Sequence, residues 1–352
     1  MNNIYFSIII PVYNAAKTIE ECVCSFIDQV DERYEIILVD DGSTDDSYRL
    51  CRELSARLPF IRTIHKSNGG SLSARIAGAE EAKGEYVIYL DADDLLEKNA
   101  IQTIEQSVLV TNADLYIFDF YQDKVRTQSK EYVKQLDPTE LTVYSGDIKK
   151  TIYSTFFEGY LNNMATTIIR RRTLEPTFVY KNTPKIRCGE DRFQKLIVLL
   201  ASETIAYVPL AFYYYRWNDG SQSSSSRLKE STIDMFDDFV ATYELEQQFY
   251  GQAGIDNKMV EKFHADHLAR LCSLTEGIIL NGEIEAADKK KYVLHVSKNT
   301  YFTAILSKEL HLTKSKNVSI ISSLLKNRRY MLLSIYIHLI NALRRLKYST
   351  HQ

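Results

Sequence analysis

The first 120 residues alternate short apolar, mostly β-branched runs with stretches that carry apolar side chains at helical spacing. A continuous apolar run predicts a strand buried on both faces, and a spacing of three to four residues predicts an amphipathic helix. Strands are expected at residues 6–10, 35–39, 61–64, 86–90 and 115–120, and helices at residues 16–29, 43–58, 71–82 and 97–110. Strands that alternate with helices build βαβ units, so we expect an α/β fold with a mostly parallel sheet flanked by helices.

The middle of the chain gives weaker signals. A strand is expected at residues 166–170, a helix at 191–201 and an aromatic strand at 211–216. From residue 231 onward the pattern is helical almost throughout, without a strong strand signal. We therefore expect an α/β domain over residues 1–228 and a helical C-terminal module over residues 229–352.

The overall composition excludes several classes of protein. A net charge of −3, with 43 basic and 46 acidic residues, lacks the basic excess of a nucleic-acid-binding protein. The five cysteines are odd in number, scattered and without a CxxC pair, which favours reduced thiols in a cytoplasmic protein. The N-terminal apolar run is short and has no basic region before it, so it predicts a strand rather than a signal peptide. No uninterrupted apolar stretch reaches the roughly 20 residues that span a bilayer.

Two aspartates follow the apolar run YVIYL with one residue between them, in the sequence DADD. Ligands of an open α/β sheet bind beyond the carboxyl ends of its strands, which is where Asp91 and Asp93 are expected. Such carboxylates hold Mg²⁺ or Mn²⁺ together with the phosphate oxygens of a substrate. Taken alone, the pattern fits an acidic strand end that caps the next helix at least as well.

Two further polar segments are expected at the same edge. In DDGSTDDS, Asp40 and Asp41 precede a Gly turn and could accept hydrogen bonds from a base or a ribose. In NGGSLSAR, a Gly pair precedes a helix that carries Arg75 in its first turns, a combination suited to a diphosphate. By itself, DDGSTDDS also fits an ordinary βα turn, and Arg75 also fits a solvated arginine.

The order and spacing of these segments together are more specific than any one of them. PVYN at residue 11, DDGSTDDS at 40, NGGSLSAR at 68, DADD at 91, CGED at 188 and YYYRWNDGS at 213 resemble glycosyltransferase family 2. The resemblance covers about residues 4–225 and does not extend into the C-terminal third. It implies the GT-A fold, a Rossmann-like α/β arrangement, and transfer of a sugar with inversion.

The resemblance implies a nucleotide pocket made of two of these segments. Pro11, Val12 and Tyr13 would line the pocket. Asp40 would hydrogen-bond the base, commonly uracil, with Asp41 as its neighbour in the donor site.

The same resemblance assigns the phosphate end of the donor. Arg75 would lie near the diphosphate, Asp91 would contact the ribose, and Asp93 would carry the metal with Asp91 beside it. Arg216 and the loop 218–226 match a segment that family members close over the donor, although a plain surface loop is the alternative. Ile76 stands where the family often has Asn, so donor contacts there are expected to differ.

Asp191 resembles the family's general base, the aspartate of a late acidic pair with Glu190. An alcohol is a poor nucleophile, and a carboxylate within hydrogen-bond reach takes its proton as the attack develops. The metal and Arg75 would meanwhile neutralise the departing nucleotide diphosphate. The alternative for the acidic pair is a stabilising interaction with the dipole of a helix.

We therefore expect a metal-dependent, inverting glycosyltransferase of the hexosyltransferase class. Its cofactor would be Mn²⁺ or Mg²⁺, its donor a nucleotide-sugar and preferably a UDP-sugar, with no nucleic-acid partner. Its acceptor would be a hydroxyl of a glycan or of a polyprenyl-diphosphate-linked oligosaccharide in bacterial surface polysaccharide synthesis. The alternative is a non-catalytic protein of the same pathway that binds nucleotide-sugars. Nucleotidyl transfer would require a Gly-rich basic loop after the first strand, and an NAD-dependent dehydrogenase would require GxGxxG; the chain has neither.

The stretch KNRRYMLLSIYIHLINALRRLKY combines an apolar helical stripe with basic residues near both ends. The stripe consists of Leu332, Ile335, Tyr336, Leu339, Ile340, Leu343 and Leu346. Over residues 326–347 this composition fits a helix in the interface of a membrane's cytoplasmic leaflet. It fits equally a helix packed against the helical module or against a partner subunit, as in a homodimer. We expect a cytoplasmic protein. If this helix binds lipid, the protein would be a peripheral protein on the cytoplasmic face of the membrane.

Overall fold

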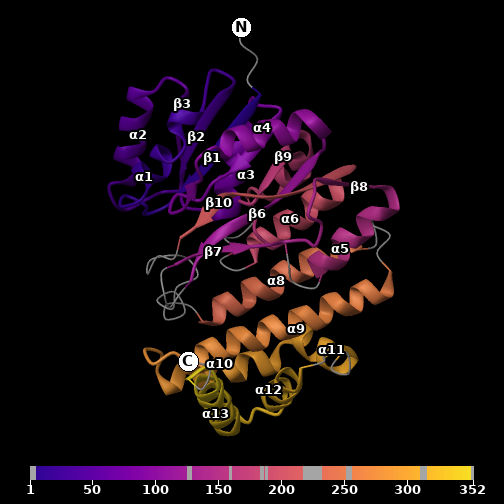
Figure 1. The fold of residues 1–352 in the computed structure, drawn as a ribbon. Coiled ribbons are helices and arrows are strands. Elements are labelled where there is room, and N and C mark those ends of the chain that lie inside the picture. The colour runs from indigo at the N-terminus through magenta and orange to yellow at the C-terminus, as the bar shows by residue number, and fades with distance from the viewer. Residues whose placement is uncertain are drawn as a thin grey trace. The chain divides into compact units, whose positions relative to one another are not determined.

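The computed structural model describes residues 5–124, 129–157, 161–182, 186, 189–216, 232–250, 256–309 and 315–349 (Figure 1). The chain divides into two compact units. The first contains residues 1–156 and 160–221, and the second contains residues 157–159 and 222–352. The boundary near residue 228 that the sequence suggests lies outside the described residues.

Within the described residues, the first unit holds one sheet of ten strands. They are β1 Phe6–Val12, β2 Tyr34–Asp40, β3 Ile61–His65, β4 Tyr86–Tyr89, β5 Leu95–Leu96, β6 Leu115–Asp123, β7 Lys130–Val133, β8 Thr142–Ser145, β9 Thr167–Arg170 and β10 Thr204–Tyr215. Their order is β3-β2-β1-β4-β9-β6-β10-β5, with β7 beside β6 and β8 beside β10. Strands β3, β2, β1 and β4 run parallel, as do β6 and β10, and most paired residues belong to these parallel pairs. The expected α/β fold with a mostly parallel sheet is confirmed.

The second half of the sheet is mixed in direction. Strand β9 lies antiparallel between β4 and β6, and β5, β7 and β8 also form antiparallel pairs. The sequence did not predict β5, β7 or β8. Strand β5 has two residues and β7 alternates exposed with half-buried positions, so neither produces a continuous apolar run. Strand β10 starts earlier than predicted and contains Pro209, where its register to β6 shifts between Val208 and Ala211.

Helices cover both faces of this sheet (Figure 1). They are α1 Ile19–Cys24, α2 Ser47–Arg57, α3 Ser71–Glu81, α4 Ala100–Thr111, α5 Lys149–Phe157 and α6 Glu190–Ala201, with 3₁₀ segments η1 Ile27–Gln29, η2 Gly146–Ile148 and η3 Arg171–Tyr180. Helices α1, α2 and α4 share one buried core with Ile8 of β1 and Ile36 of β2. Helix α3 packs on the opposite face, where a Cβ on Gly78 would lie 2.4 Å from Ile9 Cγ2. Only glycine allows this close approach, which fixes the height of α3 above β1.

Two helices are shorter than the sequence predicts. Helix α2 begins at Ser47 rather than near residue 43, because Asp45 Oδ1 accepts the Ser47 N–H at 3.0 Å and stabilises a turn before the helix. The helix expected over residues 16–29 divides into α1 and η1. At the break, Ser25 Oγ donates to the Cys22 carbonyl at 2.7 Å and accepts the Leu96 N–H at 3.0 Å. Both changes come from short polar side chains that compete with helical hydrogen bonds.

The second unit consists, in its described residues, of six helices. They are α8 Thr232–Tyr250, α9 Asn257–Leu280, α10 Ala286–Lys298, α11 Thr300–Glu309, α12 Lys316–Lys326 and α13 Tyr330–Ser349. Helix α9 packs against α8, α11, α12 and α13, and Asp256 caps it by accepting the Met259 N–H at 2.8 Å. Across the described ranges of the chain, no helix is long and apolar enough to cross a membrane.

Candidate active site

Polar residues follow three neighbouring strands of the parallel half of the sheet. In register, Val12 of β1 lies opposite Asp40 of β2, and Asp40 lies opposite His65 of β3. Strand β4 pairs with the other side of β1 and ends two residues before Asp91. The PVYN, DDGS and DADD segments therefore meet at one edge of the sheet, beyond the carboxyl ends of the strands.

Asp40 is fully buried at the end of β2. Its Oδ2 lies 2.7 Å from His65 Nδ1, and the His65 ring packs against the tilted ring of Tyr48 with ring centroids 4.4 Å apart. Its Oδ1 is buried and has no hydrogen-bond partner among the described residues. A buried carboxylate oxygen without a donor is costly, so this position is ready to accept a hydrogen bond from a bound molecule.

Asp41 is buried too, but both of its oxygens are occupied. Oδ1 accepts from Lys66 Nζ at 2.6 Å and from the Gly69 N–H at 2.9 Å, and Oδ2 accepts from the Gly70 N–H at 2.7 Å. Gly42 follows with a φ of +72°, and a Cβ there would lie 2.9 Å from Asn68 N. Asp41 therefore anchors the loop 66–70 in front of α3, and the sequence did not indicate this role.

Of the PVYN residues, Val12 has a fully buried side chain that belongs to the sheet core. Its carbonyl accepts the Asp41 N–H at 2.8 Å. Pro11 is half-buried and Tyr13 is 36% exposed. Pro11, Tyr13 and the exposed Asn14 are thus the members of the segment whose side chains solvent reaches.

Arg75 connects two acidic segments that are far apart in the sequence. It lies on α3 and is 2% exposed. Its Nη2 donates to Asp91 Oδ1 at 3.1 Å, and its Nη1 donates to Asp191 Oδ1. Burial opposes its charge, but Asp191 and Asp91 outweigh this and raise the pKa of Arg75 above its ordinary value. The guanidinium therefore holds the DADD turn and the start of α6 together.

The DADD turn contains two carboxylates with raised pKa values. Burial, opposed by Arg75, raises the pKa of Asp91 to about 6. Asp94 is 1% exposed, and burial together with Asp91 and Asp93 raises its pKa well above the ordinary value. Asp94 Oδ2 accepts from the Tyr213 hydroxyl of β10. Asp94 thus fastens the turn to β10, whereas the sequence analysis included Tyr213 in the YYYRWNDGS segment without assigning it a role.

Arg216 follows β10 and clamps the same turn. Its N–H donates to Asp94 Oδ1 at 2.8 Å, its Nε donates to the Asp93 carbonyl at 2.7 Å, and its Nη1 donates to Glu21 Oε2 at 2.5 Å. Its Nη2 is buried without a partner in the described part of the chain. The loop 218–226, which the sequence suggests as a lid, lies outside the described residues.

The first turn of α6 carries the late acidic pair. Gly189, at φ +88°, precedes the helix, and the Asp191 side chain is 30% exposed while it accepts from Arg75. Burial and the neighbouring Asp191 raise the pKa of Glu190 to about 7. One helical turn later, Lys195 is fully buried and donates to the Asn163 carbonyl at 3.2 Å. Burial, opposed by Asp191, lowers the pKa of Lys195 to about 7. A carboxylate that stays partly accessible while an arginine holds it in place is positioned to accept a proton from a bound hydroxyl.

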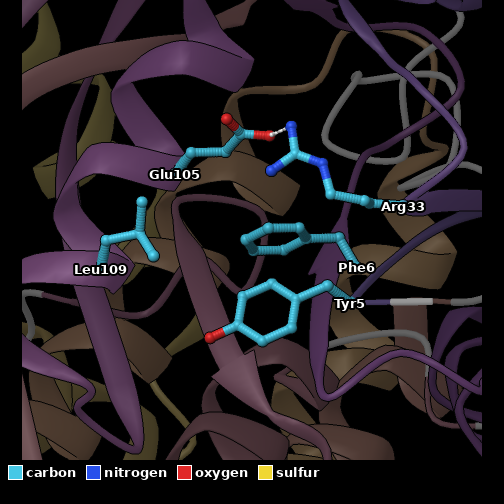
Figure 2. Close-up of a pocket in the computed structure, with 5 residues that line it drawn as sticks. All are labelled: Tyr5, Phe6, Arg33, Glu105 and Leu109. Carbon is cyan, nitrogen blue, oxygen red and sulfur yellow. Dashed lines mark hydrogen bonds and ion pairs between the residues drawn. The ribbon is translucent and has the colours of Figure 1, made fainter. Parts of the chain in front are cut away.

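A pocket of about 250 Å³ lies at the opposite ends of β1 and β2 and is separate from this site (Figure 2). Tyr5, Phe6, Arg33, Glu105 and Leu109 line it. Arg33 Nη2 donates to Glu105 at 2.6 Å across its rim, as the dashed line in Figure 2 shows. Its lining contains no residue that the sequence singled out.

Residues 7–175 match the family model described as glycosyl transferase family 2. They form a family 2 glycosyltransferase domain. This stretch of the chain contains the DDGS, NGGS and DADD segments, whereas Asp191 and Arg216 lie beyond it.

Curated relatives of this chain are glycosyltransferases of bacteria. Glycosyltransferase GlyG of Streptococcus pneumoniae is 40% identical over 116 residues, which are 33% of this chain and 38% of the relative. The uncharacterized glycosyltransferase EpsJ of Bacillus subtilis is 30% identical over 222 residues, which are 61% of this chain and 62% of the relative. The chain thus spans less than two thirds of the length of these relatives.

A solved structure has the same fold over nearly the whole chain. The crystal structure of S. aureus TarS 1–349 in complex with UDP-GlcNAc matches with a TM-score of 0.70 and 18% identity, covering 96% of this chain and 92% of that one. The fold of this chain is the GT-A fold with C-terminal helices, as the sequence predicts.

Proposed function

We propose that this chain is an inverting glycosyltransferase that moves a sugar from a nucleotide-sugar, preferably a UDP-sugar, to a hydroxyl of a glycan or of a lipid-linked oligosaccharide. The family 2 domain and the bacterial relatives support transfer of a sugar in surface polysaccharide synthesis. The observation that carries the site assignment is the Arg75 bridge, because one guanidinium holds both Asp91 and Asp191, and Asp191 lies 116 residues after Arg75.

The free Oδ1 of Asp40 supports the assignment of the base pocket. Uracil carries an imide N–H. This group can donate a hydrogen bond to a buried carboxylate oxygen that has no other donor. Asp41 serves the pocket indirectly by fixing the loop 66–70. The TarS complex with UDP-GlcNAc, in a protein of the same fold, is consistent with a uridine donor.

Asp191 is the proposed general base. It would accept the proton of the acceptor hydroxyl while that oxygen attacks the anomeric carbon of the donor sugar. The bond from that carbon to the nucleotide diphosphate breaks, and attack from the opposite face inverts the configuration. Arg75 holds Asp191 and Asp91 in place, and its direct contact with the diphosphate stays a prediction.

The residues of the DADD turn fit a divalent cation. Among the described residues, no group of three or more His, Cys, Asp or Glu side chains is arranged to hold a metal. Mg²⁺ and Mn²⁺ are commonly held by one or two carboxylates together with substrate phosphates, and Asp93 and Asp91 provide that number. Burial is the main cause of the raised pKa of Asp91, and repulsion from Asp191 and Asp93 adds to it; a cation at this turn would relieve that repulsion. When bound, the cation would neutralise charge on the leaving diphosphate.

The substitution Asp40→Asn is expected to weaken UDP binding about tenfold, because a charge-assisted hydrogen bond is replaced by a neutral one. CDP has no imide N–H at the matching ring position, so its affinity should start lower and change less. Calorimetric titration of both nucleotides measures the difference, with Asp147→Asn on an exposed side chain as the matched control. An unchanged preference for UDP over CDP in Asp40→Asn would place the base elsewhere.

The donor site as a whole is tested by titrating UDP, GDP and dTDP with Mn²⁺ and with chelator. We expect one nucleotide to bind, and we expect Asp93→Ala to lower its affinity in Mn²⁺ roughly tenfold while leaving the affinity in chelator unchanged. Asp147→Ala is the matched control. Failure of all three nucleotides to bind would refute the donor site, and tight binding without any transfer would favour a non-catalytic binding protein.

A further inference from the structure

Helix α13 presents two apolar faces. Leu333, Ile337 and Ile340 are buried on the face that packs against α9 and α12. On the other face, five large apolar side chains are more than half exposed: Met331, Leu332, Ile335, Leu339 and Leu343. A surface helix of a globular protein normally carries polar residues on its outer face. The inner face therefore accounts for the packing of α13, and the outer face needs another explanation.

The exposed positions form one continuous stripe, which differs from the stripe that the sequence predicts because Tyr336 is half-buried and Ile340 is buried. They follow one another at steps of three to four residues from Leu332 through Ile335 and Leu339 to Leu343, so they lie on one side of the helix. Between residues 331 and 343, the exposed positions also include Ala342 and His338, and His338 is the one polar side chain among them. A contiguous exposed apolar stripe of this kind marks an interaction surface.

The charge of the residues around the stripe indicates an anionic partner. Residues 310–352 contain eight Lys and Arg residues and no Asp or Glu, a charge of +8. Since the whole chain carries −3, residues 1–309 carry −11. Three of the basic residues, Lys326, Arg328 and Arg329, are exposed just before α13. Two copies that met through their stripes would bring two segments of +8 together, whereas an anionic lipid surface complements both the charge and the apolar face.

We infer that α13 lies in the interface of an anionic membrane, with the stripe in the acyl boundary and Lys326, Arg328 and Arg329 on the headgroups. The helix lies along the surface, since none of the described helices qualifies as a span. Such attachment would bring the enzyme to the surface on which lipid-linked acceptors are found. The inference rests on α13 alone and does not depend on the proposed sugar transfer.

Sedimentation of the full chain with vesicles tests this inference. We expect co-sedimentation with vesicles of phosphatidylcholine mixed with phosphatidylglycerol, and much less with phosphatidylcholine alone or at high salt. The double variant Ile335→Glu with Leu339→Glu should lower the partition coefficient by roughly tenfold or more, because it places charges in the apolar stripe. The matched control is Leu109→Glu with Val110→Glu on α4, where both side chains are also highly exposed, and it should bind as the parent does.

A second variant separates the electrostatic contribution. Arg328→Glu with Arg329→Glu leaves the stripe intact and should lower binding to the anionic vesicles about tenfold, with little effect on the weak binding to phosphatidylcholine. Circular dichroism confirms that each variant is folded. Absence of vesicle binding by the parent overturns the inference, as does equal binding to both lipids. Light scattering that finds a dimer in the parent and a monomer in Ile335→Glu with Leu339→Glu assigns the stripe to a second copy instead.

Discussion

Replacing Asp191 by Asn is expected to lower kcat for sugar transfer by about 10³-fold, within the range for loss of a general base. The amide has nearly the same shape but cannot take the proton of the acceptor hydroxyl. Nucleotide binding should change by no more than about threefold, because Asp40 and Asp93 are untouched and Arg75 keeps its contact with Asp91. The measurement pairs steady-state transfer, once a donor and acceptor are found, with calorimetric titration of the nucleotide.

The control for this prediction is Asp147→Asn. Asp147 is an aspartate with a side chain 93% exposed that pairs with Lys150, and its loss should leave both readouts unchanged. Full activity in Asp191→Asn would remove Asp191 from the mechanism and direct the search for the base to Glu190. Loss of nucleotide binding together with activity would instead mean that Asp191 orders the donor site.

Replacing Arg75 by Met is expected to lower both stability and transfer, since it breaks both halves of the bridge. Asp91 and Asp191 would lose their shared cation and repel each other across the gap. Breaking a fully buried ion pair costs about 3–5 kcal/mol, and the two carboxylates here are 29% and 30% exposed, so we expect a loss of stability of about 2 kcal/mol. Transfer should fall at least as far as in Asp191→Asn, because the proposed general base Asp191 and the DADD turn both lose the Arg75 side chain that holds them.

Arg75→Lys separates geometry from charge. Lysine keeps the cation but cannot donate to two carboxylates with a planar fork, so most of the stability should return while transfer remains reduced about 10²-fold. Denaturant unfolding and steady-state kinetics measure the two effects. Arg49→Met, which removes exposed pairs with Asp46 and Glu53 on α2, is the control and should change stability by no more than about 0.5 kcal/mol. Full transfer activity in Arg75→Lys would show that the bridge is not needed.

The parallel half of the sheet was predictable because its strands are buried on both faces. Strands β1, β2 and β4 are buried almost throughout, and such burial leaves continuous apolar runs in the sequence. The middle of the chain was harder to predict because its elements are less buried or less regular. Strand β7 exposes every second residue, so it leaves no continuous apolar run, and η3 includes a proline and is not a regular α-helix.

Part of the candidate site was predictable from the sequence, and part of it was not. Polar residues directly after an apolar strand must lie at the sheet edge, so the positions of Asp40 and Asp91 followed from the strands. The roles of Asp41 and Asp94 did not follow, because their partners are the backbone of the loop 66–70 and the Tyr213 hydroxyl of a distant strand. Hydrogen bonds of this kind depend on how loops fold back, which no spacing in the sequence encodes.

The sequence by itself determined the α/β class, the edge of the sheet that carries the site, and the acidic and basic residue types there. It also determined that the last 43 residues are basic and carry an apolar stripe. Only the tertiary structure decided that Arg75 joins Asp91 to Asp191, and that one side of α13 stays exposed while the other is buried. Apolar periodicity is a local property of the chain, whereas ion pairs between distant segments and the burial of a helix face depend on which elements pack together.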